Sequence, residues 1–264
     1  MNPLRLLAGK PRAVTRGIAR ESITFTLDNG TIVDVLRVRD SRARRIKLSV
    51  SERGARLTLP LRASEIAGER FVLEHGDWLM AQLAHNGSSA PALQPHVTAS
   101  VPLRGGDLPL LWHDGRSLRF ALEDGVLHVT IPTNVRTASL RRALRDFYEA
   151  QARTDIGRWL PRYLPDLPRA PSRLRLRMMS SQWGSLAPDG TLCLDLALVL
   201  ADPAAFEYVL VHELCHLIHA DHSRRFWREV EARFPHWRDQ RGYFRGEGRR
   251  LKAALHALCG DAKA

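Results

Sequence analysis

The chain has 264 residues, enough for one large domain or two smaller ones, and its hydrophobic fraction of 44% is ordinary for a globular protein. No apolar run approaches the roughly 18 residues of a membrane-spanning helix, so we expect no membrane partner. Forty basic residues against 28 acidic ones give a formal net charge of +12, which suits either a nucleic acid or nucleotide partner or a merely solvated basic surface.

The first residues are basic, and their apolar piece is too short for a secretory signal. We therefore predict a disordered lead-in over 1–20. The three cysteines, Cys193, Cys215 and Cys259, form no CxxC pair and no disulfide framework. This cysteine usage is typical of a reducing compartment and predicts a cytoplasmic protein.

Residues 21–134 show alternating apolar patterns separated by glycine-containing turns, which predicts an antiparallel β-rich N-terminal region. Its strongest hairpin signal is Asp28-Asn29-Gly30. One helix is predicted over 64–85, where Ser64 can act as the N-cap. The stretch 86–100 is rich in Gly, Ser, Ala and Pro and is typical of a linker. The predicted strands are 22–27, 31–39, 46–50, 55–59, 109–112, 118–122 and 126–131.

A second domain is predicted over 135–245, followed by a basic C-terminal tail over 246–264. It opens with a long helical pattern over 137–160, which a group of prolines ends. Strands over 173–178 and 191–196 follow. The fold class predicted for the whole chain is α+β.

The segment His212-Glu213-Leu214-Cys215-His216 is an HExxH pattern. It lies in a predicted helix over 203–219 that has Asp202 as its N-cap. Positions i and i+4 share a helix face, so His212 and His216 can bind one Zn²⁺ together. Glu213 lies about 100° around the helix, where a general base can take a proton from a water that the metal activates.

The third ligand has two candidates. His222 lies six residues after His216, the spacing of the metzincin zinc peptidases, and can turn back to the metal if the chain reverses after His219. His219 shares the helix face but lies about 4.5 Å beyond His216 along the axis, so it is the less favourable ligand. Asp221 and Ser223 supply the caps for such a reversal and for a new helix.

Substrate contacts are predicted at two places. Trp183, Gly184 and Ser185 form a tight piece between the two strands predicted before the HExxH helix, and an edge strand beside a metal can pair with an extended peptide. Gly184 would let a peptide backbone approach closely. Farther on, Tyr243 and His236 are candidate donors to an oxyanion, although each residue type is more often structural.

These motifs resemble those of the YgjP-like metallopeptidases, relatives of the SprT and WLM zinc proteases. The resemblance rests on four segments in a fixed order, namely 181–185, 190–196, 208–216 and the pattern HSxxFW over 222–227. It implies a zincin-like domain behind a β-rich part. It also implies zinc held by His212, His216 and His222, with Glu213 as the catalytic residue.

The favoured function is therefore a zinc metallopeptidase that acts on a peptide or protein. Two alternatives remain open. A nucleoside-triphosphate pyrophosphatase could use the same metal, although the chain has no Gly-rich phosphate loop. A DNA-associated SprT-like protease would account for the net charge of +12.

Overall fold

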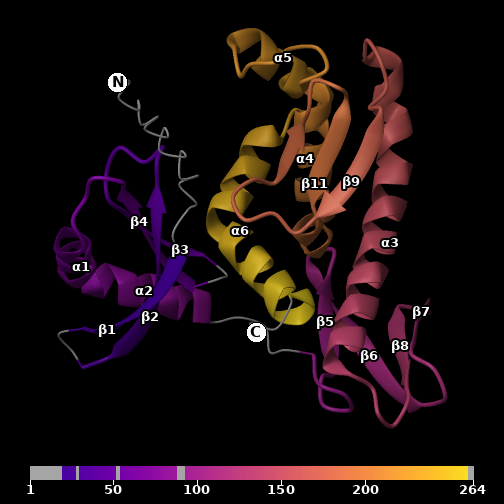
Figure 1. Ribbon diagram of the computed structural model, residues 1–264. Helices are drawn as coiled ribbons and strands as arrows, with labels where there is room; N and C mark the ends of the chain where they lie inside the picture. Colours follow the sequence, from indigo (N-terminus) through magenta and orange to yellow (C-terminus); the bar gives the residue numbers. More distant parts are fainter. Residues whose placement is uncertain (1–19, 28–29, 52–53, 88–92, 261–264) are drawn as a thin grey trace, which may run out of the picture. The chain divides into compact units, whose positions relative to one another are not determined.

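The computed structural model describes residues 20–27, 30–51, 54–87 and 93–260 (Figure 1). The predicted lead-in up to residue 19 and the Asp28-Asn29 part of the first turn lie outside the described residues. The chain divides into two compact units, Met1–Leu83 and Ala84–Ala264. It combines helices with several small sheets, so the fold is mixed α+β, as predicted. Among the described residues, no helix has the length and apolarity to cross a membrane.

A four-stranded sheet forms the first unit, in the order β1-β2-β4-β3. The sheet is mixed and not purely antiparallel as predicted, because β2 and β4 run parallel. After β2 the chain forms β3 at the edge of the sheet. It then turns back as β4, which lies between β2 and β3 and pairs antiparallel with β3. Its strands are β1 (Arg20–Thr26), β2 (Ile32–Asp40), β3 (Lys47–Ser51) and β4 (Gly54–Pro60).

The helix predicted over 64–85 is broken into two helices, α1 (Glu65–Glu74) and α2 (Gly76–Gly87). The side chain of Ser64 caps α1, as predicted. The break occurs at His75, whose backbone angles (φ −109°, ψ 21°) are not helical. Buried side chains of both helices pack with those of the sheet into the core of this unit.

The second unit begins with a sheet in the order β5-β6-β8-β7, in which β6 and β8 are parallel. Sequence patterns grouped these strands with the N-terminal region, but they share a core with the long helix α3 (Thr137–Tyr163). The hydroxyl of Tyr148 in α3 donates to the Pro102 carbonyl at 3.0 Å. The strands are β5 (Ser100–Leu103), β6 (Gly106–Asp114), β7 (Arg119–Glu123) and β8 (Val126–Ile131).

A three-stranded sheet follows, in the order β10-β11-β9. Strand β10 lies at the edge and pairs only on one side, antiparallel to β11, within the described part of the chain. The elements of this segment are η1 (Leu164–Asp166), β9 (Arg173–Arg177), β10 (Gly184–Leu186), β11 (Thr191–Asp195) and η2 (Leu196–Leu200).

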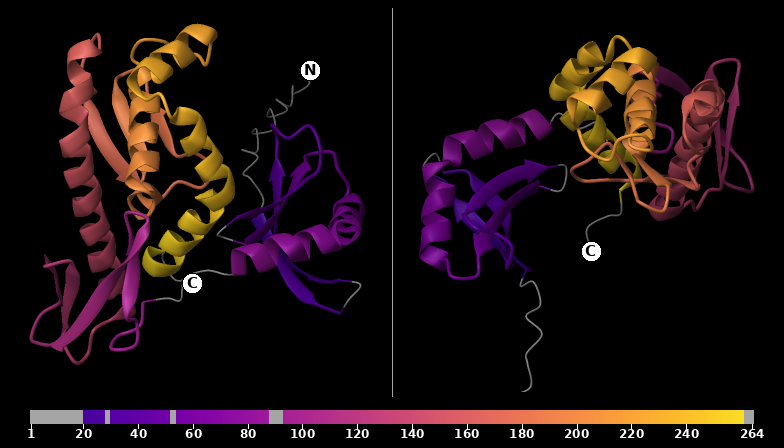
Figure 2. Two further views of the ribbon diagram at one scale, coloured as in Figure 1. Left: turned by 180° about the vertical axis from the view of Figure 1, so that it is seen from behind. Right: turned by 90° about the horizontal axis from the view of Figure 1, so that it is seen from above.

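Three helices complete this unit, namely α4 (Pro203–Cys215), α5 (Arg224–Arg233) and α6 (Trp237–Cys259). The helix α4 and the three-stranded sheet lie between α3 and α6 (Figures 1 and 2). Residues 246–259, predicted as a basic tail, instead form the second half of α6. Leu255 and Leu258 are buried there, so this segment is an amphipathic helix that packs on the core and not a solvated tail.

Candidate active site

Helix α4 carries His212 and Glu213 from the protein core to the surface of a groove. Asp202 caps its N-terminus by accepting a hydrogen bond from the Ala204 N–H at 2.8 Å, and the helix is buried along most of its length. This packing leaves the helix little freedom to shift. His212 and Glu213 are therefore held on a rigid element.

The helix ends earlier than predicted, at Cys215, and His216 is its C-cap. The chain then reverses, and Ser223 caps α5, as predicted. The reversal brings His222 back to the helix, so that its Nε2 lies 3.0 Å from the Nε2 of His212. His212, His216 and His222 each offer a ring nitrogen, and these three nitrogens all lie within 4.8 Å of one another. We call them the three-histidine cluster.

His219 has a different place. Its backbone carbonyl lies 3.0 Å from Nδ1 of His216. A carbonyl oxygen can only accept a hydrogen bond, so Nδ1 of His216 carries the proton. The lone pair on Nε2 of His216 is then free to bind a metal ion. His219 thus fixes the orientation of a cluster residue through its main chain, and its ring is not part of the cluster.

The cluster has the chemistry of a zinc site. Burial, together with the neighbouring His216 and His222, lowers the pKa of His212 to about 3, and burial also lowers the pKa of His216. Both rings are therefore neutral at neutral pH, the form that binds metals. Three imidazole nitrogens suit zinc better than magnesium or calcium, which favour oxygen ligands. The residues present thus fit a zinc ion.

One aromatic ring packs against the whole cluster. The ring centre of Phe226, which is fully buried, lies 4.9 Å from that of His212, 4.5 Å from that of His216 and 4.8 Å from that of His222. Nδ1 of His212 is buried and has no hydrogen-bond partner among the described residues. Packing, more than hydrogen bonding, must therefore orient the His212 ring.

Glu213 lies beside the cluster with 6% of its surface exposed. Burial raises the pKa of its carboxyl to about 7. Strand β10 passes directly over it, because a Cβ atom on Gly184 would lie 2.6 Å from Cγ of Glu213. The sequence suggested that Gly184 makes room for a substrate backbone, whereas in the structure it makes room for the Glu213 side chain.

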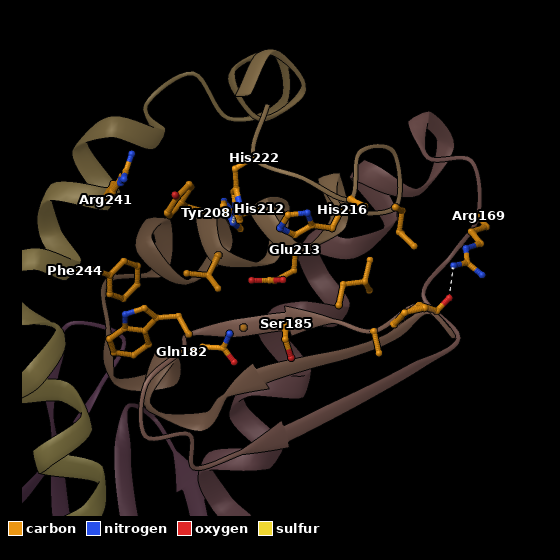
Figure 3. Close-up of a pocket in the computed structure, with 18 residues that line it drawn as sticks. Arg169, Gln182, Ser185, Tyr208, His212, Glu213, His216, His222, Arg241 and Phe244 are labelled. Atoms are coloured by element: carbon orange, nitrogen blue, oxygen red, sulfur yellow. Dashed lines mark hydrogen bonds between the residues drawn. The ribbon is translucent and has the colours of Figure 1, made fainter. Parts of the chain in front are cut away.

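The cluster and Glu213 open into a groove of about 690 Å³ between α4 and β10 (Figure 3). Trp183, Gly184 and Ser185 line it together with the three-histidine cluster. Arg169 and Arg241 mark its two ends, with Glu213 between them (Figure 3).

Tyr243 and His236 are not among the residues that line the groove. The Tyr243 hydroxyl instead accepts a hydrogen bond from the Asp202 N–H at 3.2 Å, at the start of α4. That point is ten residues before His212, or about 15 Å along the helix. The structure therefore does not bring Tyr243 to the cluster, and His236 is exposed beside Asp239.

Among the polar residues of the groove, sequence reasoning missed Tyr208 and Arg241. Tyr208 precedes His212 by four residues, so the helical spacing could have revealed it. Its pKa is raised to about 12, mainly by burial, so the hydroxyl stays protonated and can donate. Arg241 comes from α6, and no local pattern connects it with the HExxH segment.

The loop that leads into β10 is fixed by Lys252 of α6. Its ammonium group donates to the carbonyls of Met179 at 2.7 Å and Gln182 at 2.8 Å, and it pairs with the buried carboxylate of Asp195. It also lies 4.4 Å from the ring centre of Trp183. Lys252 thus connects α6, β11 and the wall of the groove.

A family model described as "YgjP-like, metallopeptidase domain" matches residues 44–246. The chain therefore belongs to the YgjP-like metallopeptidase family, and it is a metallopeptidase at the level of that family.

Among solved structures, the metallopeptidase zymogen of Pyrococcus abyssi abylysin is similar in sequence, at 25% identity. The match covers 40% of this chain and 96% of that chain, with a TM-score of 0.29. No curated protein matches the chain.

Proposed function

We propose that the protein is a zinc-dependent metallopeptidase in which His212, His216 and His222 hold the metal and Glu213 is the general base. The observation that carries the proposal is the convergence of three ring nitrogens beside a buried carboxylate, at the floor of an open groove. Zinc in such a site supplies Lewis-acid polarisation of a carbonyl and lowers the pKa of a coordinated water to about 7.

The residues of the chain then perform the proton transfers. The Glu213 carboxylate takes a proton from the water whose oxygen adds to the scissile carbonyl carbon. The same carboxyl group delivers that proton to the amide nitrogen as the C–N bond breaks, so the products are a carboxylic acid and an amine. Tyr208 lies next to His212, with ring centres 5.9 Å apart, and its protonated hydroxyl is a hydrogen-bond donor in the same groove.

The peptide is held as an added strand. Among the residues that the structure describes, no strand pairs with the outer edge of β10 beside Glu213, and an extended peptide can hydrogen-bond to such an edge through its backbone. Backbone pairing places little demand on substrate sequence, so side-chain preference must come from the ends of the groove.

Glu213→Gln tests the chemical role. The amide keeps the size of the side chain but cannot accept the proton, so we expect hydrolysis of an unfolded protein such as casein to fall by about 10²–10⁴-fold. Zinc content should remain that of the unmodified protein. Full hydrolytic activity in a zinc-loaded Glu213→Gln protein would show that this mechanism is wrong.

A further inference from the structure

Arg241 is a cation without an anion at the α6 end of the groove. Its side chain is exposed and lines the groove, and its guanidinium carbon lies 5.4 Å from the ring centre of Trp227. Among the described residues no carboxylate lies within ion-pair distance of it. Arg238 on the same helix, by contrast, is paired with Glu231 at 2.8 Å. Arg241 therefore has its charge available to a ligand.

Aromatic packing holds the Arg241 side chain in place. Trp227, over which it lies, is stacked on Trp237 with ring centres 4.4 Å apart. This aromatic pair joins α5 to α6 and gives the guanidinium a fixed platform. A guanidinium that is held in place loses less conformational entropy when it binds a ligand.

A second donor lies at the same end. Tyr208 is drawn beside Arg241 in Figure 3, and its hydroxyl makes no hydrogen bond within the described part of the chain. Trp183 and Phe244, whose ring centres are 4.5 Å apart, form an apolar wall there. The Arg241 and Tyr208 donors can bind a carboxylate, and the apolar wall can pack against the short aliphatic stem that carries it.

The charges that line the groove also favour a carboxylate at this end. Its charged lining residues are Arg169, Arg241 and Glu213, and Glu213 is reserved for the chemistry. A bound zinc ion would add positive charge. A cationic side chain at this end would be repelled, whereas a carboxylate would make charge-assisted, bidentate hydrogen bonds with the guanidinium.

We propose that Arg241 and Tyr208 form a subsite for the side-chain carboxylate of an Asp or Glu residue, so that the preferred substrates are acidic peptides. This rests on the proposed peptidase function, because it names the substrate of that same groove. From the strength of a hydrogen bond to a charged group, replacing the carboxylate by an amide should weaken binding about tenfold.

Binding is measured first, on full-length Glu213→Gln protein loaded with zinc, so that no probe is consumed. The probes are fluorescein-labelled neutral peptides that carry a single Glu, Gln or Lys at each position in turn, read by fluorescence anisotropy. We expect Glu to be favoured over Gln about tenfold at one position, with Lys weaker still. Arg241→Gln, added to Glu213→Gln, should abolish the preference, and Tyr208→Phe should reduce it.

Arg245→Gln is the matched control, because Arg245 lies one turn farther along α6, is exposed and does not line the groove. It should keep the full preference. Each peptide is also tested as a C-terminal acid and as an amide. Inorganic pyrophosphate is added as a competitor.

Three results would overturn the proposal. These are equal binding of Glu and Gln peptides, a preference that follows only the free C-terminus, and a preference that pyrophosphate abolishes at lower concentration than the acidic peptide does. Hydrolysis is then measured on the protein with Glu213 intact. Failure of Glu213→Gln to reduce hydrolysis would reject the peptidase mechanism, while the ratio of Glu to Gln binding would still decide the subsite.

Discussion

Gly184 on β10 and Glu213 on α4 are packed so closely that no side chain can stand between them. A Cβ atom at position 184 would lie 2.6 Å from Cγ and 2.7 Å from Oε1 of Glu213. Contacts below 3.0 Å force one of the two groups to move. The edge strand that we expect to bind the peptide therefore also sets the position of the proposed general base.

Gly184→Ala should accordingly displace the Glu213 carboxylate. A misplacement of about 1 Å at a reacting group can cost about 10²-fold in rate, and we expect a loss of this order in kcat. Overpacking should lower the free energy of unfolding by about 1–3 kcal/mol. Steady-state kinetics and urea unfolding measure the two effects.

Gly157→Ala is the control for that substitution. Gly157 lies within α3, and nothing stands within 4 Å of an added Cβ there. Alanine should raise stability by about 0.5–1 kcal/mol and leave the rate unchanged. A Gly184→Ala protein with unchanged kcat would disprove the proposed link between β10 and Glu213.

Phe226 should act on metal affinity through ring packing. Phe226→Leu removes the contacts that orient all three rings of the cluster. Replacing a residue that orients metal ligands typically weakens metal binding by about 10–100-fold. We therefore expect the zinc dissociation constant of Phe226→Leu to rise by about this factor. Competition with a fluorescent zinc chelator measures the dissociation constant.

The comparison is Phe206→Leu. Phe206 is equally buried and packs edge-on against Trp159 at 5.2 Å, away from the cluster. Both variants should lose roughly 1–3 kcal/mol of stability, but only Phe226→Leu should lose zinc affinity. Equal zinc affinities in the two variants would mean that Phe226 is merely a core residue.

Lys252→Met should make stability depend on pH through Asp195. Burial raises the pKa of Asp195 above its usual 3.8, and Lys252 opposes this rise. Without Lys252 the carboxylate is buried and unpaired, which should cost about 3–5 kcal/mol near neutral pH. The pKa of the folded state then rises further. A carboxyl group with a raised folded pKa destabilises the protein when ionised, and this cost disappears as the pH falls below that pKa.

The gap in unfolding free energy between Lys252→Met and the unmodified protein should therefore narrow as the pH is lowered from 7 toward the usual Asp range. Urea unfolding across this range measures it. Adding Asp195→Asn should recover much of the loss at pH 7, since it removes the unpaired charge. A gap that stays constant with pH would contradict the role assigned to this ion pair.

The parts of the site that the sequence predicted are local. Asp202 and Ser223 cap their helices through hydrogen bonds to residues two or three positions on, and the HExxH spacing is fixed by helix geometry. His222 was predictable as well, because a short reversal is all that it needs.

The parts that could not be predicted depend on contacts between distant segments. Nothing near β2 in the sequence says that β4 will pair with it in parallel, or that Arg241 will reach the groove from α6. Gly184 was predicted to let a peptide backbone approach closely. The group that lies against it is Glu213 of α4, a contact that no local pattern predicts. The nucleotide pyrophosphatase and DNA-associated alternatives stay predictions.

The central claim is that His212, His216 and His222 hold one zinc ion, and elemental analysis of the purified protein tests it most directly. We predict about one zinc per chain, retained in His219→Ala and lost or weakened in His222→Ala, because His219 contributes only its backbone carbonyl. Absence of zinc from the unmodified protein after zinc is supplied, or equal zinc content in His219→Ala and His222→Ala, would contradict the account.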